Sequence, residues 1–261
     1  DIEAYEDNRI PFERSQKFAV GNVADLLALG FDPEKGYIYQ QSKETRVKDL
    51  AIMFGRGVTL ATMKAIYGER HMGLYLSSLI QAGDILLPQM KDFGGPKPTV
   101  VPVGIDQDPH LRLTRDLAFK FRSKYKFIPP SSTYHKLIKA LDGSPKMSKR
   151  DPMSYFTLEE KPEVIAKKIS NAFTGGRPTA EEQRRLGANP DICPIYDLYL
   201  FHFFERDEDV AKLYNYECKG GHILCGEDKE RLIKIVTEFV KEHQRKRRKF
   251  IDKARETLQI S

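Results

Sequence analysis

Apolar residues recur every three or four positions in the first third of the chain, which is the spacing of helices with one buried face. Residues 12–29 show this pattern through Phe18, Val23 and Leu27, and Gly30 follows as a residue suited to end a helix. The same spacing predicts further helices, namely residues 42–54 with Ser42 as the cap, residues 59–66 and residues 74–85.

Two short runs carry a strand pattern instead. Residues 37–39 (YIY) predict a short strand, and the apolar run 99–103 (TVVPV) ends at Gly104 and predicts a buried parallel strand. A polar turn follows, and then a helix from about Pro109, a residue suited to a first helical turn, to Phe121. The pattern leaves residues 131–139 open between strand and other structure.

The second half of the chain is helical almost throughout, with glycine-containing breaks at residues 175–178 and 220–221 and a final helix from about 227 to 258. Residues 142–150 (DGSPKMSKR) have the composition of a loop. Because strands and helices alternate before residue 155 and only helices follow, we expect an α/β domain over 1–155 and an all-helical domain over 156–261.

Composition narrows the class of protein. The 261 residues are 40% hydrophobic and 31% charged, and the mean hydropathy is −0.50, as in globular proteins that do not enter a membrane. Three cysteines are too few for a disulfide framework and favour a reducing compartment, so we expect a cytoplasmic protein. The chain starts at Asp1 with residues typical of a loop interior, and we expect that an upstream segment precedes it.

The excess positive charge lies in one place. The formal net charge is +6, and residues 241–255 contain eight Lys or Arg and two acids, which also gives +6. Five consecutive cations, Arg245, Lys246, Arg247, Arg248 and Lys249, surround a helix on all sides because a turn has 3.6 residues. Such a segment suits a polyanion such as RNA, and a solvated helix end is the alternative.

A short loop sequence carries candidate chemistry. Lys146, Met147, Ser148, Lys149 and Arg150 follow a Gly-Ser-Pro segment, so two ammonium groups and a hydroxyl lie on a cationic arm. Such an arm stabilises the charge that develops on a departing pyrophosphate without any protein nucleophile. A chance surface loop is the alternative for these five residues alone.

The predicted strand and turn at residues 101–116 form a second candidate site. Gly104 stands at the carboxyl end of the strand, where ligands bind in open α/β sheets. Asp106 can accept hydrogen bonds from both ribose hydroxyls, and Gln107 can bind the polar groups of a substrate. An ordinary turn with an aspartate cap would have the same residues.

Together the two motifs, GIDQD followed by KMSKR, resemble class I aminoacyl-tRNA synthetases. The longer context resembles the tryptophanyl-tRNA synthetases of the archaeal and eukaryotic type over essentially the whole chain. The matching stretches include DIEAY, SLIQAGD, VPVGIDQDPHLRLTRD, AFTGGRPTAEEQRRLG and CKGGHILCGEDK. The resemblance implies the later half of a Rossmann-like nucleotide-binding domain with a parallel sheet, followed by a helical anticodon-binding domain.

The resemblance also implies a reaction and roles. Tryptophan and ATP, with Mg²⁺, would form an adenylate and pyrophosphate, and the acyl group would pass to tRNA(Trp). Glu3 corresponds to a carboxylate that accepts the indole N–H, and Gln81 and Gln107 to residues of the amino-acid site. ATP-binding residues would be Gly104, Asp106, Lys146, Met147, Ser148 and Lys149, of which Lys146, Ser148 and Lys149 are catalytic. The family is homodimeric, and the basic segment 245–249 would contact tRNA.

Two features depart from the family pattern. Arg150 replaces the usual serine, and the His-x-Gly-His signature that binds ATP is missing, since His71-Met72-Gly73-Leu74 lacks the second histidine and lies in a helix region. We expect the genuine signature upstream of Glu3, and the chain alone to be incomplete for adenylate formation. A tyrosyl-tRNA synthetase and a non-catalytic tRNA-binding relative or fragment stay open as alternatives.

The cysteines are a last candidate. Cys218 and Cys225 flank two glycines and His222, and Cys193 is the only other thiol. A structural zinc site uses four ligands, so we favour small buried or half-exposed cysteines without a ligated metal, and we predict neither a bound metal nor an organic cofactor.

Overall fold

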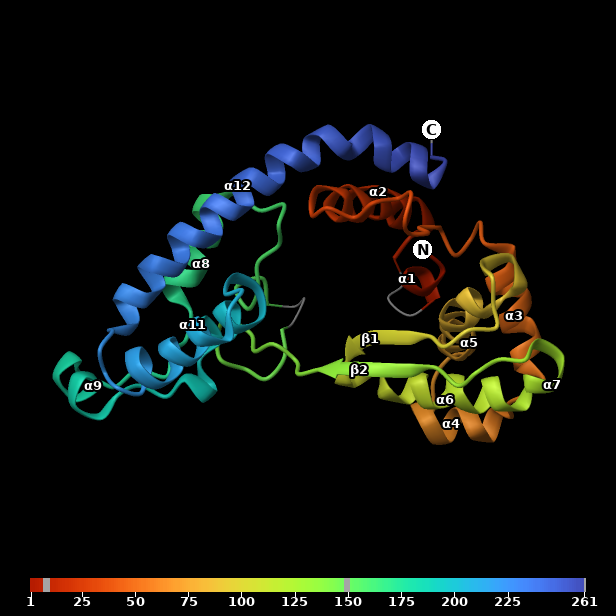
Figure 1. The fold of residues 1–261 in the computed structure, drawn as a ribbon, viewed down its shortest axis with the longest axis horizontal. Coiled ribbons are helices and arrows are strands. Elements are labelled where there is room, and N and C mark those ends of the chain that lie inside the picture. The colour runs from red at the N-terminus through yellow and green to blue at the C-terminus, as the bar shows by residue number, and fades with distance from the viewer. Residues whose placement is uncertain (7–9, 148–150, 261) are drawn as a thin grey trace. The chain divides into compact units, whose positions relative to one another are not determined.

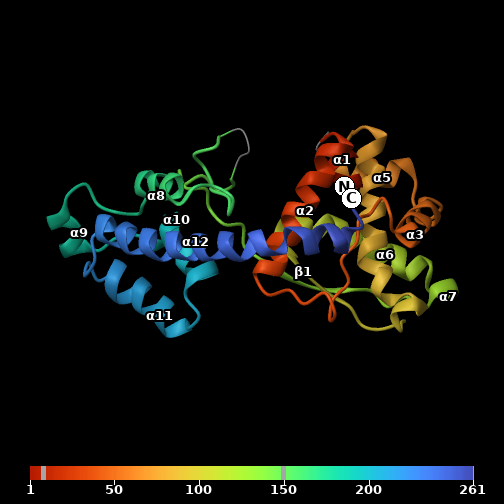
Figure 2. The same ribbon diagram turned by 90° about the horizontal axis from the view of Figure 1, so that it is seen from above.

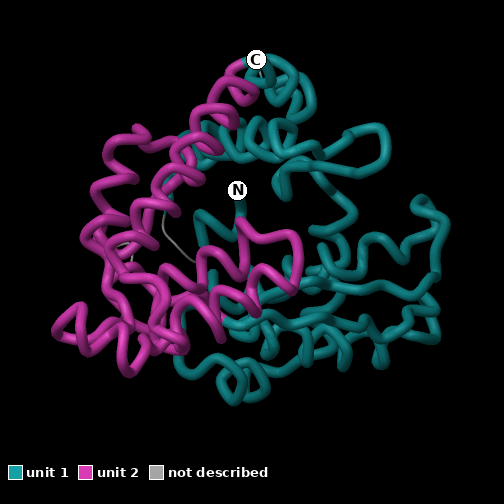
Figure 3. Tube along the Cα trace, turned by 60° about the vertical axis from the view of Figure 1, so that its left-hand side comes forward, with its two compact units in different colours: residues 1–136, 249–261 teal, residues 137–248 magenta. Residues whose placement is uncertain are grey.

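The computed structural model describes residues 1–6, 10–147 and 151–260. The chain forms two compact units, one of residues 1–136 and 249–261 and the other of residues 137–248, coloured separately in Figure 3. The long C-terminal helix α12 (Cys225–Leu258) contributes to both units. The predicted domain boundary after residue 155 stays a prediction.

Figure 1 shows the elements of the first unit around a pair of strands. Its helices and strands are α1 (Ile2–Glu6), α2 (Phe12–Ala28), α3 (Thr45–Gly55), α4 (Leu60–Tyr67), α5 (Met72–Leu86), β1 (Val100–Gly104), α6 (Asp108–Lys120), α7 (Arg122–Tyr125) and β2 (Ser131–His135). Short 3₁₀ turns lie at Leu87–Gln89, Lys91–Phe93 and Ile105–Gln107.

The second unit is helical in the part that the structure describes. It contains α8 (Pro162–Asn171), α9 (Ala180–Leu186), α10 (Pro194–Leu198), α11 (Asp207–Ala211) and the first part of α12, with a 3₁₀ turn at Pro190–Ile192. Wider π-helical turns at Tyr199–Phe203 and Lys212–Cys218 continue α10 and α11. The helical second half predicted from the sequence is therefore confirmed.

The helix predictions for the first half are confirmed with one corrected cap. Thr59 caps α4 through its side chain, and Gly30 follows α2 with φ +101°, a value that favours glycine. Ser42 as a cap is wrong, because α3 begins at Thr45 and the Glu44 carboxylate accepts the hydrogen bond from the Arg46 amide. The Ser42 hydroxyl donates instead to the Asp1 carboxylate.

The sheet differs from the prediction in two respects. β1 and β2 pair in parallel, with Val100 opposite Ser131 and Gly104 opposite His135, and α6 lies between them in the chain. Val100 is 61% exposed, so β1 is not the fully buried strand that its apolar run predicts, since it has a single strand neighbour among the described residues. The predicted strand at residues 37–39 is wrong, because this segment has no strand partner in the part of the chain that the structure describes, and its tyrosines bind carboxylates.

Each unit has its own apolar core. In the first unit, α3, α5 and α6 bury Leu50, Phe54, Leu86 and Leu117 together. A smaller cluster joins α2 to the last turns of α12, where Val23 and Leu27 pack with Ala254 and Leu258; Figure 1 and Figure 2 show these two segments side by side. Lys43 closes the end of α12, because its ammonium donates to the carbonyls of Leu258 and Gln259 at 2.8 and 2.7 Å.

The second unit buries the apolar face of α12 against α8 and α10. Ile165, Ile169, Ile195 and Tyr199 are 0–1% exposed, and Leu232, Val236 and Val240 of α12 are fully buried. These three α12 residues recur at intervals of four, which is the spacing of one helix face. The opposite face of α12 is left for polar and charged side chains.

Candidate active site

The turn after β1 holds three of the predicted site residues. Gly104 ends the strand, and Asp106 and Gln107 lie in the 3₁₀ turn that leads directly into α6. Asp106 is exposed and Gln107 is half-buried. Gly104 has φ −70° and ψ 155°, values open to any residue, so glycine is needed here only if a ligand approaches the backbone closely.

Two residues predicted from separate motifs are in contact. Gln81 of α5 donates from Nε2 to Oε1 of Gln107 at 2.9 Å, and both side chains are half-buried. α5 packs against α6, which follows the turn, so the two glutamines approach from neighbouring elements. The bond leaves the Gln81 oxygen and the Gln107 amide N–H groups for other partners.

Glu3 lies on α1, which packs against α5. The Glu3 backbone N–H donates to Oε1 of Gln41 at 3.1 Å. Nε2 of Gln41 donates to Oδ2 of Asp84 on α5 at 2.6 Å, and the Tyr39 hydroxyl donates to Oδ1 of the same carboxylate at 2.5 Å. Burial raises the pKa of Asp84, and the hydrogen bonds from Tyr39 and Gln41 act in the opposite direction.

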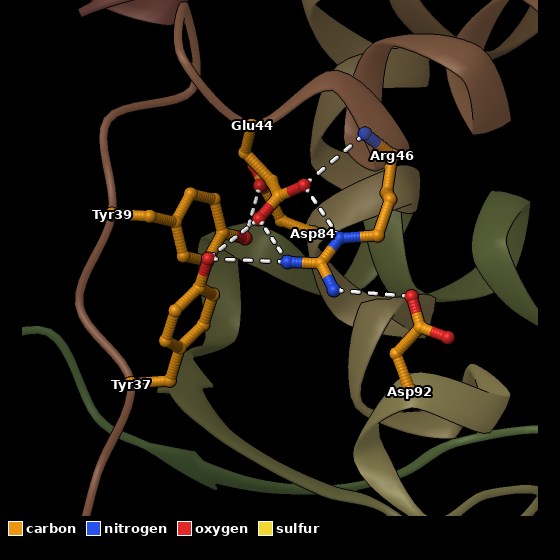
Figure 4. A network of polar contacts seen from close by, with 6 residues as sticks. All are labelled: Tyr37, Tyr39, Glu44, Arg46, Asp84 and Asp92. Carbon is orange, nitrogen blue, oxygen red and sulfur yellow. Dashed lines mark hydrogen bonds and ion pairs between the residues drawn. The ribbon is translucent and has the colours of Figure 1, made fainter.

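A second polar network lies beside Tyr39 in Figure 4. Glu44 is 5% exposed and accepts from the Arg46 guanidinium at 2.6 and 2.7 Å and from the Tyr37 hydroxyl at 2.7 Å. Hydrogen bonds from Arg46 lower the pKa of Glu44 to about 2. Arg46 also pairs with Asp92 at 3.3 Å and lies over the ring of Phe93, so residues 37–46 are fixed to the short turn after α5.

The cationic loop lies in the second unit. Asp142 Oδ1 accepts from the backbone N–H and hydroxyl of Ser144 at 2.9 and 2.6 Å, and Gly143 takes φ +86°. This turn leads to Lys146 and Met147, which are both exposed. Ser148, Lys149 and Arg150 lie outside the described residues.

The five cations of the basic segment of α12, residues 245–249, differ in their exposure and in their partners. Arg245, Lys246, Arg248 and Lys249 are exposed, and Arg245 and Lys246 pair with Glu242 on the same helix at 2.7 and 3.5 Å. The Arg247 side chain is 18% exposed and pairs with Glu159. Gln244 donates to the carbonyls of Leu158 and Glu160 and so holds that segment against α12.

The cysteines are buried or half-buried thiols. Burial raises the pKa of Cys193 and raises that of Cys218 to about 12, so both stay protonated at neutral pH. Within residues 1–6, 10–147 and 151–260, no three His, Cys, Asp or Glu side chains gather in a way that could hold a metal ion. Every helix in that range is too short or too polar to traverse a bilayer.

Sequence reasoning missed Gln41 and Asp84. The available signal was the spacing within SLIQAGD, where Asp84 follows Gln81 by three residues and so lies on the same helix face. Gln41 has no local signal, because its partners Glu3 and Asp84 are 38 and 43 residues away in the chain.

Comparisons with known proteins identify the family of the chain. Residues 7–241 match the family described as tRNA synthetases class I (W and Y). The tryptophan–tRNA ligases of Methanocaldococcus jannaschii and Hyperthermus butylicus are both 42% identical, and the matches cover 95% and 99% of this chain and 68% and 70% of theirs. The crystal structure of tryptophanyl-tRNA synthetase from Aeropyrum pernix K1 superposes with a TM-score of 0.93 at 43% identity, over 99% of this chain and 70% of that one. The chain therefore belongs to the tryptophanyl-tRNA synthetases and has the class I fold with its parallel sheet and helical C-terminal part.

Proposed function

We propose that the protein activates tryptophan with ATP and transfers it to tRNA(Trp), with the amino acid held between α1, α5 and the turn after β1. The observation that carries the proposal is the 2.9 Å hydrogen bond between Gln81 and Gln107, which joins side chains from two separate motifs. Their remaining amide groups suit the ammonium and carboxylate of an amino acid. Glu3 supplies the acceptor for the indole N–H, a group that only donates.

The nucleoside of ATP is assigned to the turn after β1, and its phosphates are assigned to the cationic loop on the family resemblance alone. Gly104 lets a nucleoside approach the backbone, and Asp106 is exposed and able to accept ribose hydroxyls. Lys146, Met147, Ser148 and Lys149 bind the triphosphate of ATP, which enters as a substrate with Mg²⁺. Lys146, Ser148 and Lys149 then stabilise the charge that builds on pyrophosphate as the adenylate forms.

The tRNA is assigned to the helical part, residues 156–261, as an anticodon-binding domain. Arg245, Lys246, Arg248 and Lys249 are exposed and supply cations for its phosphates, and Arg247 adds a cation already paired with Glu159. The proposal includes a homodimer in the cytoplasm, which rests on the family resemblance and on the frequency of two-fold symmetric association.

Amino-acid-dependent exchange of label between pyrophosphate and ATP tests the activation step in the full-length protein. We expect exchange with tryptophan and little with tyrosine or phenylalanine, because neither offers an indole N–H to Glu3. Faster exchange with tyrosine would contradict the assignment. Binding of tRNA without any exchange would favour a non-catalytic relative.

A further inference from the structure

Asp84 is a carboxylate whose two oxygens are both used. Oδ1 accepts from the Tyr39 hydroxyl at 2.5 Å and Oδ2 from Nε2 of Gln41 at 2.6 Å. It projects from α5 toward Tyr39, as Figure 4 shows. A carboxylate in a low-dielectric site forms short, strong hydrogen bonds, so each donor is held in one orientation.

Gln41 transmits that orientation to α1. Because its NH₂ group faces Asp84, its Oε1 faces the Glu3 backbone N–H and accepts from it at 3.1 Å. A five-residue helix such as α1 does not persist by itself, so its place depends on contacts like this one. Asp1 makes a second tie, since its carboxylate accepts from the backbone N–H of Ser42 at 3.1 Å.

The same helix carries a proposed tryptophan contact. Gln81 precedes Asp84 by three residues, so the two side chains leave α5 on the same face. One series of hydrogen bonds thus connects Glu3, through Gln41, to the helix that positions Gln81. The series therefore holds the Glu3 backbone in place relative to α5.

We infer that Asp84 and Gln41 are positioning residues that fix Glu3 relative to Gln81 and thereby set the preference for an amino acid with an indole N–H. The inference rests on the proposed function, in which Glu3 accepts that N–H. In this role both residues act through Glu3 and not on the substrate itself. They affect the discrimination between amino acids with and without an indole N–H. An acceptor that is misplaced by a fraction of a hydrogen-bond length no longer forms a good hydrogen bond with that donor.

The test compares tryptophan with 3-benzothienylalanine, in which sulfur replaces the indole N–H, in pyrophosphate exchange by the full-length protein. The readout is the ratio of kcat/KM for the two amino acids. Asp84→Asn turns an NH₂ group toward one of the two donors, and we expect the ratio to fall on the order of tenfold, mostly through a higher KM for tryptophan.

Exchanging the two groups supplies a rescue. Gln41→Glu alone puts two carboxyl groups at hydrogen-bond distance and weakens the tie by repulsion. In the double variant Gln41→Glu/Asp84→Asn, the carboxylate introduced at position 41 accepts from the amide introduced at position 84 and from the Glu3 N–H. We therefore expect the ratio to return to within about twofold of the original. Tyr39→Phe removes the other bond to Asp84 but not the tie to Glu3, and we expect it to leave the ratio unchanged.

The outcomes separate this inference from the proposed function. If Glu3→Ala leaves the ratio unchanged, Glu3 does not accept the indole N–H, and the proposed tryptophan site is wrong. If Glu3→Ala lowers the ratio but Asp84→Asn does not, only the positioning inference is overturned. It is also overturned if Tyr39→Phe lowers the ratio as much as Asp84→Asn, or if the double variant is no better than the worse single variant.

Discussion

The polar residues between α1, α5 and the turn after β1 differ in kind from the cations of the loop at Lys146 and of the basic segment of α12. Gln81, Gln107, Gln41 and Asp84 are half-buried and bonded in pairs, Gln81 to Gln107 and Gln41 to Asp84. The cations at Lys146 and along residues 245–249 are mostly exposed and, where paired, bind acids on the surface. The first group is thus ordered before any substrate arrives, whereas the second supplies charge that needs a polyanion to act on.

The two regions can therefore contribute differently to the reaction. Groups that are fixed by mutual hydrogen bonds can position a substrate, and each depends on its neighbours, so the effects of single substitutions there are coupled. Exposed cations in water gain little from surface ion pairs and cost little stability when removed. Their effect is expected only in steps where phosphate charge is bound or released.

The largest expected effect belongs to an exposed cation. Lys146→Ala should lower kcat of tryptophan-dependent pyrophosphate exchange on the order of 100-fold and change tryptophan affinity much less, because its charge matters as pyrophosphate leaves. Steady-state exchange together with equilibrium tryptophan binding separates the two. Lys161→Ala removes an exposed lysine of the same unit as a control. Equal losses in rate and binding would remove Lys146 from the chemical step.

For the two glutamines of the amino-acid site we expect the opposite result, a larger effect on tryptophan binding than on the rate. Gln107→Leu leaves Gln81 without its partner, and we expect KM for tryptophan to rise about tenfold with a smaller change in kcat. Gln81→Leu should do the same, and the double variant should be little worse than either, as expected for two residues that act as one unit. Additive losses would show that the two side chains bind tryptophan independently.

The helices were predictable because the signals for them lie within each segment of the sequence. Apolar spacing predicts α2, α4, α5 and α12 within two residues at each end, and the strand before Gly104 is recognisable from five residues. The run at residues 37–39 is misleading because alternation alone cannot show whether a partner strand exists, and here the tyrosine hydroxyls bind Glu44 and Asp84 instead.

The site was predictable only in part, because its contacts join residues that are far apart in the sequence. Gln81 and Gln107 came from motifs, but their hydrogen bond spans 26 residues of chain, and the Gln41 contacts span more. The sequence groups Arg247 with its neighbours as a basic segment. In the structure its position on the helix directs its side chain to Glu159, 88 residues earlier in the chain. Local patterns identify which residue types are present, and tertiary packing decides which of them meet.

A third prediction concerns the network that fixes residues 37–46. Hydrogen bonds from Arg46 hold the pKa of Glu44 at about 2, below its usual 4.5, so the folded state binds this proton more weakly than the unfolded state. The stabilisation from Glu44 is fully present above pH 4.5 and is lost as pH falls toward 2. Glu44→Gln should lower stability by about 1 kcal/mol at pH 7 and remove that part of the acid sensitivity.

Denaturant unfolding at several pH values checks this. The control is Glu242→Gln, since Glu242 has a similarly lowered pKa through Arg245 but its side chain on α12 is 44% exposed. We expect its substitution to change stability at pH 7 much less, because solvated pairs contribute little. If the two substitutions had equal effects, the burial of Glu44 would carry no extra stability.

The smallest effect tests the two kinds of cation against each other on one helix. Arg248 is exposed, whereas Arg247 is mostly covered and paired with Glu159. If both contact tRNA phosphates, each change to Gln lowers affinity a few-fold and reduces the slope of log affinity against log salt by about one. We expect this for Arg248→Gln and a smaller slope change for Arg247→Gln, because a cation already neutralised by a carboxylate releases fewer counterions. Glu159→Gln should then raise the slope by freeing Arg247, and an unchanged slope in all three variants would make this segment solvated surface alone.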